Sequence, residues 1–137
     1  MKHRQHEYPR IPFSGIKLRR GLSGFGIFAT EPIKKGTFII EYWGPLLNDE
    51  ETTKKGGKYL FEVAKNKTID GSSRKNTARY INHACKPNCE VTITGGRVFI
   101  HAIKNIKEGE ELTYDYGKEY VDEYIKPYGC RCKTCKK

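Results

Sequence analysis

Cysteine spacing is the first feature of this sequence that indicates chemistry, because Cys130, Cys132 and Cys135 stand within six residues. Three thiols this close together are ill suited to three separate disulfides, but they can wrap one tetrahedral metal ion. A closed structural zinc site takes four ligands, so a fourth must come from elsewhere in the chain. Cys85 and Cys89 are the remaining cysteines. The one that is not a ligand would be a small buried hydrophobic residue.

Two further stretches carry groups that could hold a ligand. RYINHACKPNC, at residues 79–89, places an Asn-His pair beside both of these cysteines, and His83 by itself could be a metal ligand or a general base. Gly24 and Gly26 flank Phe25 between two predicted strands. Because neither glycine carries a Cβ, the backbone there can approach a ligand closely. The same G-x-G pattern also occurs in plain turns, and it lacks the strand-to-helix setting of a dinucleotide fingerprint.

A tyrosine pair forms the last of these stretches, since Tyr114 and Tyr116 stand two residues apart in ELTYDYG. On a strand, residues two apart point to the same face. Such a pair could line a site, but paired tyrosines also occur in cores with their hydroxyls hydrogen-bonded. The elements that position all these residues therefore matter.

Short β-branched and aromatic runs, separated by glycine, proline, asparagine or Lys-Gly, predict that these elements are mostly short strands. ITGGRVFIHAI predicts a hairpin, because Gly95 and Gly96 can take positive φ at its turn. The predicted strands cover residues 16–20, 26–30, 36–44, 59–63, 66–70, 89–94 and 97–103.

One helix is expected in the first half of the chain, from about Asn48 to Lys55. Asn48 or Asp49 can cap its start, and Gly56-Gly57 can end it. A second helical turn is expected near residues 118–125. No internal repeat and no low-complexity segment is evident. The 137 residues predict a single, mainly β domain.

Composition and charge limit the classes of function that this chain can have. Hydrophobic residues make up 36% of the chain and charged residues 31%, and no apolar stretch approaches the roughly eighteen residues that span a bilayer. The first fifteen residues lack the apolar region of a secretory signal. We therefore expect a protein that works inside the cell and does not associate with a membrane. In that compartment clustered cysteines favour metal over disulfides. The formal charge of +10 favours phosphate-rich partners, but the lysines are scattered, which is more typical of a solvated surface.

Taken together and in this order, these stretches resemble the SET-domain protein lysine methyltransferases. The resemblance runs from about Ile16 to Cys135. It rests on GFG followed by EYWG, then YLFEV, ARYINHACKPN, GEELTYDYG and the cysteine cluster that the family calls post-SET. The resemblance implies a mainly β SET-domain fold of the β-clip type, with small sheets, a knot-like C-terminal crossing and a zinc-binding tail. It divides the chain into an N-terminal extension (1–15), a SET domain (16–117) and a post-SET zinc-binding segment (118–137).

The activity that the resemblance implies is transfer of a methyl group from S-adenosylmethionine to a protein lysine. Tyr116 corresponds to the catalytic tyrosine, and Tyr42 and Tyr114 correspond to walls of the lysine channel. Cys85 becomes the fourth zinc ligand, which leaves Cys89 as a free thiol. Cofactor contacts are implied for Gly24, Phe25, Gly26, Tyr59, Asn82 and His83, and zinc ligation for Cys85, Cys130, Cys132 and Cys135.

Physical chemistry agrees with an aromatic channel, because only a neutral amine can attack a methyl group. Apolar surroundings and a nearby sulfonium charge both disfavour the ammonium form of lysine. In the family that the sequence resembles, tyrosine instead of phenylalanine two residues before the catalytic tyrosine accompanies lower methylation states, so the resemblance implies that Tyr114 gives mainly monomethyl product with some dimethyl product. The family pattern is not matched everywhere: Ala84 stands where serine is common, and the Cys132–Cys135 spacer is short.

The expected partner is a protein or peptide that carries lysine, such as a histone, and the basic charge allows proximity to nucleic acid. The absence of a pre-SET cysteine array predicts a compact microbial or viral member. The expected location is the nucleus or chromosome in a eukaryote and the cytoplasm in a microbe. Two alternatives are a basic zinc-stabilised nucleic-acid-binding module and a SET-like module that binds a peptide without catalysis. The sequence gives no oligomeric state and does not identify the substrate lysine.

Overall fold

The computed structural model of the chain describes residues 12–21 and 24–117, which form several small β-sheets. The first is an antiparallel hairpin of β1 (Ile16–Gly21) and β2 (Gly24–Ala29). The second has the strand order β3-β9-β8, built from β3 (Phe38–Tyr42), β8 (Cys89–Thr94) and β9 (Arg97–Ala102). The third has the order β4-β6-β5, built from β4 (Leu46–Leu47), β5 (Leu60–Ala64) and β6 (Lys67–Asp70).

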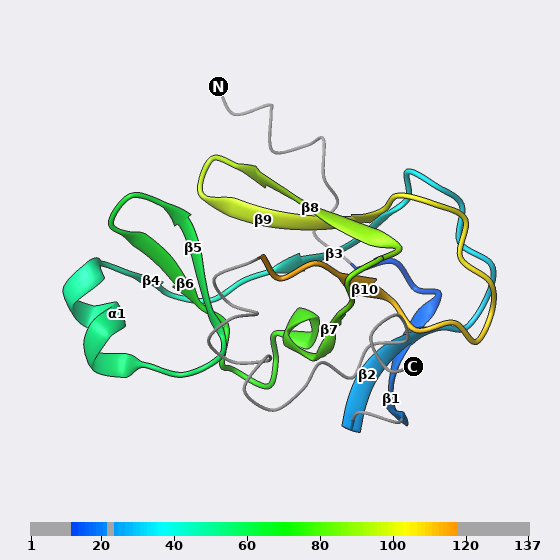
Figure 1. The fold of residues 1–137 in the computed structure, drawn as a ribbon, viewed down its shortest axis with the longest axis horizontal. Helices are drawn as coiled ribbons and strands as arrows, with labels where there is room; N and C mark the ends of the chain where they lie inside the picture. Colours follow the sequence, from blue (N-terminus) through cyan, green and yellow to red (C-terminus); the bar gives the residue numbers. More distant parts are fainter. Residues whose placement is uncertain (1–11, 22–23, 118–137) are drawn as a thin grey trace.

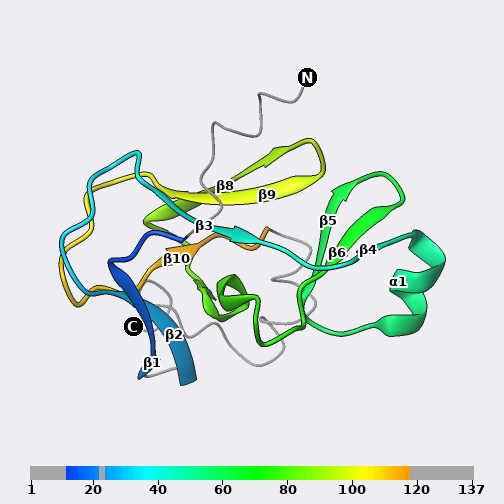
Figure 2. The same ribbon diagram turned by 180° about the vertical axis from the view of Figure 1, so that it is seen from behind.

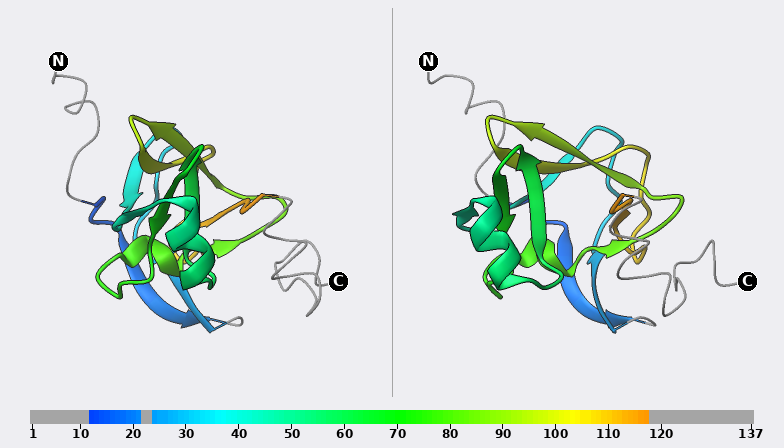
Figure 3. Two further views of the ribbon diagram at one scale, coloured as in Figure 1. Left: turned by 90° about the vertical axis from the view of Figure 1, so that its left-hand side faces the viewer. Right: turned by 60° about the vertical axis from the view of Figure 1, so that its left-hand side comes forward.

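Two short strands far apart in the sequence meet at the centre of the fold. β7 (Asn82–His83) follows the 3₁₀ helix η2 (Thr77–Tyr80) in the chain. It pairs in parallel with β10 (Thr113–Tyr114). Figure 1 shows β7 and β10 lying between the β3-β9-β8 sheet and the β1-β2 hairpin. The side views of Figure 3 place the β8-β9 hairpin and the β1-β2 hairpin on opposite sides of this centre. The mainly β, small-sheet class predicted from the sequence is confirmed.

The predicted helix and hairpin are both confirmed. Helix α1 (Asp49–Lys55) begins after Asn48, whose side chain accepts a hydrogen bond from the Glu51 amide while the Glu51 carboxylate accepts one from the Asn48 amide. This reciprocal capping box satisfies two amides that the helix leaves free. Gly95 and Gly96 both have positive φ at the β8-β9 turn. Seen from behind in Figure 2, α1 lies at one end of the molecule and the β1-β2 hairpin at the other.

Three local expectations differ from the structure. Gly24-Phe25-Gly26 begins β2 instead of lying between strands. Tyr116 lies beyond β10, which ends at Tyr114, because only residues 113–114 of this segment pair with β7. The 3₁₀ helix η2 and the two-residue strands β4 and β7 were not predicted, since elements this short leave no period in the sequence. The expected helical turn near 118–125 lies outside the described residues.

An internal symmetry that the sequence does not display joins the β2-β3 and β9-β10 loops. The amides and carbonyls of Ile33 and Ile106 bond reciprocally at 2.8 Å. The Gly36 amide donates to the Ala102 carbonyl, and 73 residues later the Gly109 amide donates to the Ala29 carbonyl, again at 2.8 Å in both cases. In Figure 1 these two loops, coloured cyan and yellow, run side by side. The two loops therefore form matching hydrogen bonds between their backbone amides and carbonyls.

The hydrophobic core lies beneath these loops and between the sheets. Isoleucines dominate it, which fits the preference of β-branched residues for strands. Among the described residues, no helix is long and apolar enough to span a membrane. The largest fully buried apolar side chains are Ile27, Ile33, Ile39, Ile81, Val98, Ile100, Ile106 and Leu112.

Candidate active site

A cavity walled by aromatic side chains lies where β3, the start of β5 and the end of β10 meet. Tyr42 and Tyr114 are only 4% and 6% exposed, so these two rings form buried walls of the space. The rings of Tyr114 and Tyr116 lie 5.0 Å apart and both line this space, although Tyr116 lies beyond the strand on which both were predicted. We call this space the tyrosine cavity. Its lining residues are Tyr42, Lys58, Tyr59, Leu60, Phe61, Arg79, Tyr114 and Tyr116.

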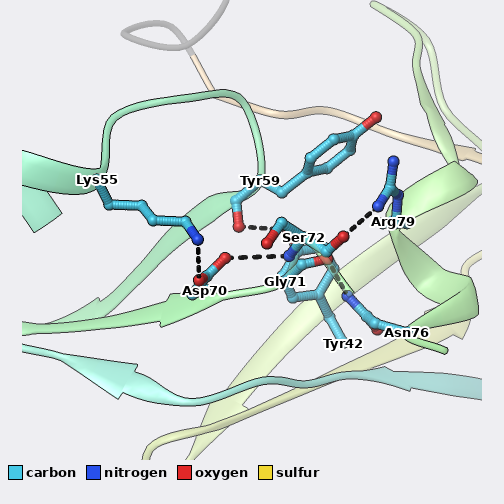
Figure 4. Close-up of polar contacts among 8 residues, drawn as sticks. All are labelled: Tyr42, Lys55, Tyr59, Asp70, Gly71, Ser72, Asn76 and Arg79. Atoms are coloured by element: carbon cyan, nitrogen blue, oxygen red, sulfur yellow. Dashed lines mark hydrogen bonds and ion pairs between the residues drawn. The ribbon is translucent and has the colours of Figure 1, made fainter. Parts of the chain in front are cut away.

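The ring of Tyr42 is held tightly from two directions. Its hydroxyl donates a 3.0 Å hydrogen bond to the carbonyl of Tyr59, which also accepts a 2.7 Å bond from the Gly71 amide. Gly71 lies so close to the ring that a Cβ there would come within 2.4 Å of Tyr42 carbon atoms. Only glycine fits this contact without displacing the ring. Tyr42 is therefore a rigid wall of the tyrosine cavity (Figure 4).

Asn76 ties this wall to the neighbouring loop. Its side chain is completely buried, accepts a 3.2 Å hydrogen bond from the Trp43 amide and donates a 3.0 Å bond to the Gly71 carbonyl. A buried amide with both ends bonded is favourable, whereas an unpaired one would be costly. Asn76 thus links the residue after Tyr42 to the glycine that packs on it.

Arg79 closes one side of the cavity with a charged group. Its guanidinium lies 4.2 Å from the centre of the Tyr59 ring and 5.0 Å from that of Tyr80, and it donates a hydrogen bond to the Ser72 carbonyl. Its Nε atom is buried and has no hydrogen-bond partner among the described residues. A buried donor without a partner is costly, so this atom could bind an acceptor on a ligand.

An ion pair supports the loop that carries Gly71. The ammonium of Lys55, at the end of α1, lies 3.2 Å from a carboxylate oxygen of Asp70 (Figure 4). Burial by itself would raise the pKa of Asp70, but hydrogen bonds from Ser72 and the charge of Lys55 outweigh it and lower that pKa. Asp70 is therefore ionised at neutral pH and holds the turn at Ser72.

The β7-β10 crossing places the Asn-His pair beside the two C-terminal tyrosines. The Ala84 amide donates a 3.2 Å hydrogen bond to the Tyr114 carbonyl. The hydroxyl of Tyr116 donates to the Ile81 carbonyl. Asn88, from the Pro-Asn of the NHACKPN motif, accepts from the Thr113 amide and donates to the Glu111 carbonyl, both at 2.9 Å. This crossing was expected from the resemblance, and the structure contains it.

His83 is buried within the crossing, where burial lowers the pKa of its imidazole and the nearby carboxylate of Asp115 offsets this only in part. Its Nδ1 atom accepts a 3.1 Å hydrogen bond from the Tyr116 amide. That bond assigns the ring hydrogen to Nε2, which faces the sulfur of Cys85 at 3.6 Å. A neutral ring in this tautomer positions Tyr116.

Asn82, which precedes His83 on β7, contacts the start of β2. Its side-chain amide donates to the Phe25 carbonyl at 3.0 Å and to a carboxylate oxygen of Glu111 at 2.7 Å. A Cβ on Gly26 would lie 2.3 Å from the same Glu111 oxygen, so a larger residue there would have to displace the Glu111 carboxylate. The structure therefore brings GFG and Asn82 together around Glu111.

The predicted zinc site is described only in part. Cys85 is exposed, while Cys130, Cys132 and Cys135 lie outside the described residues. Within the part of the chain that the structure describes, no three His, Cys, Asp or Glu side chains are grouped to hold a metal. Cys89 is 1% exposed in the core, and burial raises the pKa of its thiol to about 12 despite a hydrogen bond from Thr113. Cys89 therefore packs as a hydrophobic residue.

Several residues near the site were not singled out from the sequence. Glu111 could have been noticed as a carboxylate three residues before Tyr114, and Asn88 as part of the motif. Nothing in the local sequence signals Lys58, Asn76 or Arg79, because their importance comes from burial or from segments distant in the chain. These five residues are Lys58, Asn76, Arg79, Asn88 and Glu111.

Comparisons with known proteins agree with this geometry. The profile of the SET domain matches residues 24–117. Histone-lysine N-methyltransferase trithorax of Drosophila melanogaster is 37% identical over 100% of this chain. Histone-lysine N-methyltransferase set-2 of Caenorhabditis elegans is 38% identical over 88% of it, and the "Histone-lysine N-methyltransferase, H3 lysine-4 specific" of Eremothecium gossypii is 37% identical over 86%. The chain spans 4%, 9% and 14% of the lengths of these relatives.

Proposed function

Because the chain belongs to the SET-domain family, we propose that it is a protein-lysine N-methyltransferase that uses S-adenosylmethionine as the methyl donor. The observation that carries this proposal is the β7-β10 crossing, which sets the Asn82-His83 pair and the Tyr114-Tyr116 pair on the two sides of one short parallel bridge. Methyl transfer is an in-line displacement, so its main requirement is to bring donor and acceptor end to end. The crossing joins the part of the site proposed for the lysine to the part proposed for the donor, and so meets that requirement.

The tyrosine cavity is proposed as the channel for the substrate lysine. Tyr42 and Tyr114 form buried walls, and aromatic faces attract a cation while their apolar surroundings favour loss of its proton. Tyr116 is proposed as the catalytic tyrosine that orients the amine. Its backbone is fixed by His83, and its ring stands against that of Tyr114.

The donor is proposed to bind on the GFG side of the crossing. When bound, S-adenosylmethionine would supply a sulfonium methyl group, which a neutral amine can accept as the neutral thioether leaves. Gly24, Phe25 and Gly26 offer backbone at the start of β2, where Asn82 donates to the Phe25 carbonyl, and His83 follows Asn82 on β7. Tyr59, predicted as a further cofactor contact, lines the tyrosine cavity together with Arg79, whose Nε is buried without a partner among the described residues.

A structural zinc ion is proposed to be held by Cys85, Cys130, Cys132 and Cys135. Cys85 lies at the surface, whereas Cys89 is excluded from this role because it is buried in the core. We further propose the division into an extension over 1–15, a SET domain over 16–117 and a zinc-binding segment over 118–137. The family profile, which ends at residue 117, supports the second of these boundaries.

Histones are the proposed substrates, and the nucleus or chromosome is the proposed location. The names of the relatives support this choice, and one of them specifies lysine 4 of histone H3. The net charge of +10 would repel a basic histone tail, so acidic residues near the site would have to receive it. The run Asp49, Glu50 and Glu51 at the start of α1 is exposed and offers such charge. The basic surface also permits proximity to nucleic acid.

Burial argues against the alternative in which the aromatic residues form a nucleic-acid-binding face. Proteins that bind single strands present aromatic side chains on an open surface with basic residues around them. Tyr42 and Tyr114 are instead almost completely buried. Phe25, which is 48% exposed and lies 4.9 Å from the guanidinium of Arg20, is the feature that most favours that alternative.

Two measurements on the full chain test the proposed function. Calorimetric titration with S-adenosylmethionine should show one-to-one binding, and recombinant histone H3 should acquire methyl groups detectable by mass spectrometry. The matched control is a histone H3 in which arginine replaces the fourth residue, a lysine, and it should lose the label if that lysine is the target. Donor binding without methylation of any histone would favour a non-catalytic peptide-binding module. A well-folded, zinc-loaded protein that fails to bind the donor would overturn the proposal.

A further inference from the structure

Lys58 lines the tyrosine cavity and, among the described residues, is the one lysine that does so. The residue is exposed, so its long side chain is not committed to the core. We infer that Lys58 is a site of self-methylation, in which its own amine enters the tyrosine cavity and receives the methyl group. This inference rests on the proposed function, because it uses the same cavity and the same donor.

The backbone holds Lys58 at the rim of the cavity. The next residue is Tyr59, whose carbonyl accepts hydrogen bonds from the Gly71 amide at 2.7 Å and from the Tyr42 hydroxyl at 3.0 Å. The α-carbon of Lys58 is therefore joined directly to a fixed part of the cavity wall. A lysine side chain at this position starts within its own length of the enclosed space.

The residues before Lys58 leave its side chain room to turn. Gly56 and Gly57 have φ values of 62° and 105°, and no atom lies within 4 Å of a Cβ built at either position. Glycine backbone can change conformation with little steric cost. Lys58 thus has a fixed anchor on one side and an adaptable, open segment on the other.

Neighbouring lysines differ from Lys58 in ways that make them controls. The ammonium of Lys55 lies 3.2 Å from Asp70 (Figure 4), and Lys54 is an exposed residue of α1 that does not line the cavity. In the part of the chain that the structure describes, no ion pair involves Lys58. Its place at the cavity therefore distinguishes Lys58 from both, and the lack of an ion pair among the described residues distinguishes it from Lys55.

The transfer balances without any further reagent. The Lys58 ammonium first gives one proton to solvent, and the freed lone pair of Nζ forms a bond to the methyl carbon of the donor. The bond from that carbon to the sulfonium sulfur breaks, and its electron pair stays on sulfur as a neutral thioether. The product is a methylated ammonium that keeps one positive charge. While Lys58 occupies the cavity, a substrate lysine cannot, so the two amines compete.

Mass spectrometry can test the modification directly. The full chain is incubated with S-adenosylmethionine carrying a deuterated methyl group, with and without recombinant core histones, and is then digested with a protease that does not cleave at lysine. We expect label at Lys58, with a rate constant that does not change on dilution because the transfer is intramolecular. The label should fall to background in Lys58→Arg and persist in Lys54→Arg.

Each other outcome contradicts the inference in a recognisable way. Labelled histones with an unlabelled Lys58 would leave the proposed function standing and overturn self-methylation. A rate constant proportional to protein concentration would show transfer between copies and overturn the intramolecular geometry. No label on histones or chain would remove the proposed function and this inference with it.

A second measurement needs no turnover. Reductive methylation with ¹³C-formaldehyde gives each lysine an NMR signal, and S-adenosylhomocysteine is then added. The Lys58 signal, assigned by its absence in Lys58→Arg, should shift when the ligand binds at the other end of the cavity, while the Lys54 signal stays in place. An unchanged Lys58 signal under saturating ligand would show that its amine does not reach the cavity.

Discussion

The backbone amide of Tyr116 donates a hydrogen bond to Nδ1 of His83, with 3.1 Å between the two nitrogens. The histidine is therefore an acceptor at Nδ1, and burial keeps its ring neutral by lowering its pKa. Its ion pair with Asp115, at 3.7 Å, would require the charged ring and is weak at most. The role that this geometry supports is to fix the last tyrosine at the end of the crossing, since a neutral acceptor holds an amide without taking part in proton transfer.

Tyr116→Phe should lower turnover by about 10²-fold or more, the effect typical of one positioned catalytic group. Tyr116 lines the cavity and, in the proposed role, its hydroxyl orients the amine. Steady-state methylation of histone H3 measures the loss, and calorimetry should find donor affinity nearly unchanged.

If Tyr116 served only packing, the same variant would lose stability instead of activity. Its hydroxyl donates to the Ile81 carbonyl, and removal of one such bond costs roughly 0.5–1.5 kcal/mol. Near-normal turnover together with a lower melting temperature would assign the residue a structural role.

Tyr114→Phe should shift the products towards higher methylation states. In the proposed channel, the Tyr114 hydroxyl holds the amine or a water by a hydrogen bond worth about 0.5–1.5 kcal/mol, and the space it defines limits further methyl groups. The wild type should give mainly monomethyl-lysine with some dimethyl-lysine. Mass spectrometry under single-turnover and exhaustive conditions decides the point. Trimethyl-lysine from the wild type, or an unchanged distribution in the variant, would refute the switch.

Gly71→Ala should destabilise the chain and impair methylation together. The new methyl group would lie 2.4 Å from carbon atoms of the Tyr42 ring, and overpacking of this kind costs about 1–3 kcal/mol. Denaturant unfolding reports the first effect, and turnover of the folded variant reports the second. Normal activity in a folded Gly71→Ala protein would mean that the position of Tyr42 is not critical.

Cys132→Ser should remove the metal and most of the donor affinity. Structural zinc can contribute roughly 10–16 kcal/mol in small domains, and the proposed site includes this thiolate. Metal analysis of purified protein measures occupancy. Cys89→Ser is the control and should keep full zinc, although a hydroxyl in the core makes it less stable by about 1–3 kcal/mol. Full occupancy in the Cys132 variant would contradict the ligand assignment.

Cys89 should contribute to stability in a way that fades at high pH. Burial raises the pKa of its thiol from 9.0 to about 12. Above pH 9 the unfolded thiol ionises while the folded one does not, so the unfolded state binds fewer protons and the free energy of unfolding falls as pH rises. Denaturation from pH 8 upwards should show a smaller decline in Cys89→Ala than in wild type. Equal declines would show that this thiol is not responsible.

Sequence reasoning located most of the secondary structure and the family, and physical reasons explain its success. Capping by Asn48 and the paired glycines at 95 and 96 act through near neighbours, so their signals are local. The crossing of residues 82–83 with 113–114 depends on pairing over thirty residues, and only the resemblance to a known family supplied it.

What sequence reasoning missed is non-local. Arg79 matters because its Nε is buried without a partner among the described residues, and Gly71 because a distant ring packs on it. Lys58 is an ordinary residue in sequence and gains interest only from its place at the rim of the cavity. The proposed roles of the predicted site residues stay predictions until the variants above are measured.

The reciprocal hydrogen bonds of Ile33 with Ile106 also bear on how the chain reaches its native state. These partners are 73 residues apart, so the entropy of closing a long loop must be lost before any of the paired bonds forms. Contacts of such high sequence separation slow folding relative to local hairpins. We therefore expect the hairpins β1-β2 and β8-β9 to form early and the joining of the two loops to be the rate-limiting event, after which the fold closes cooperatively.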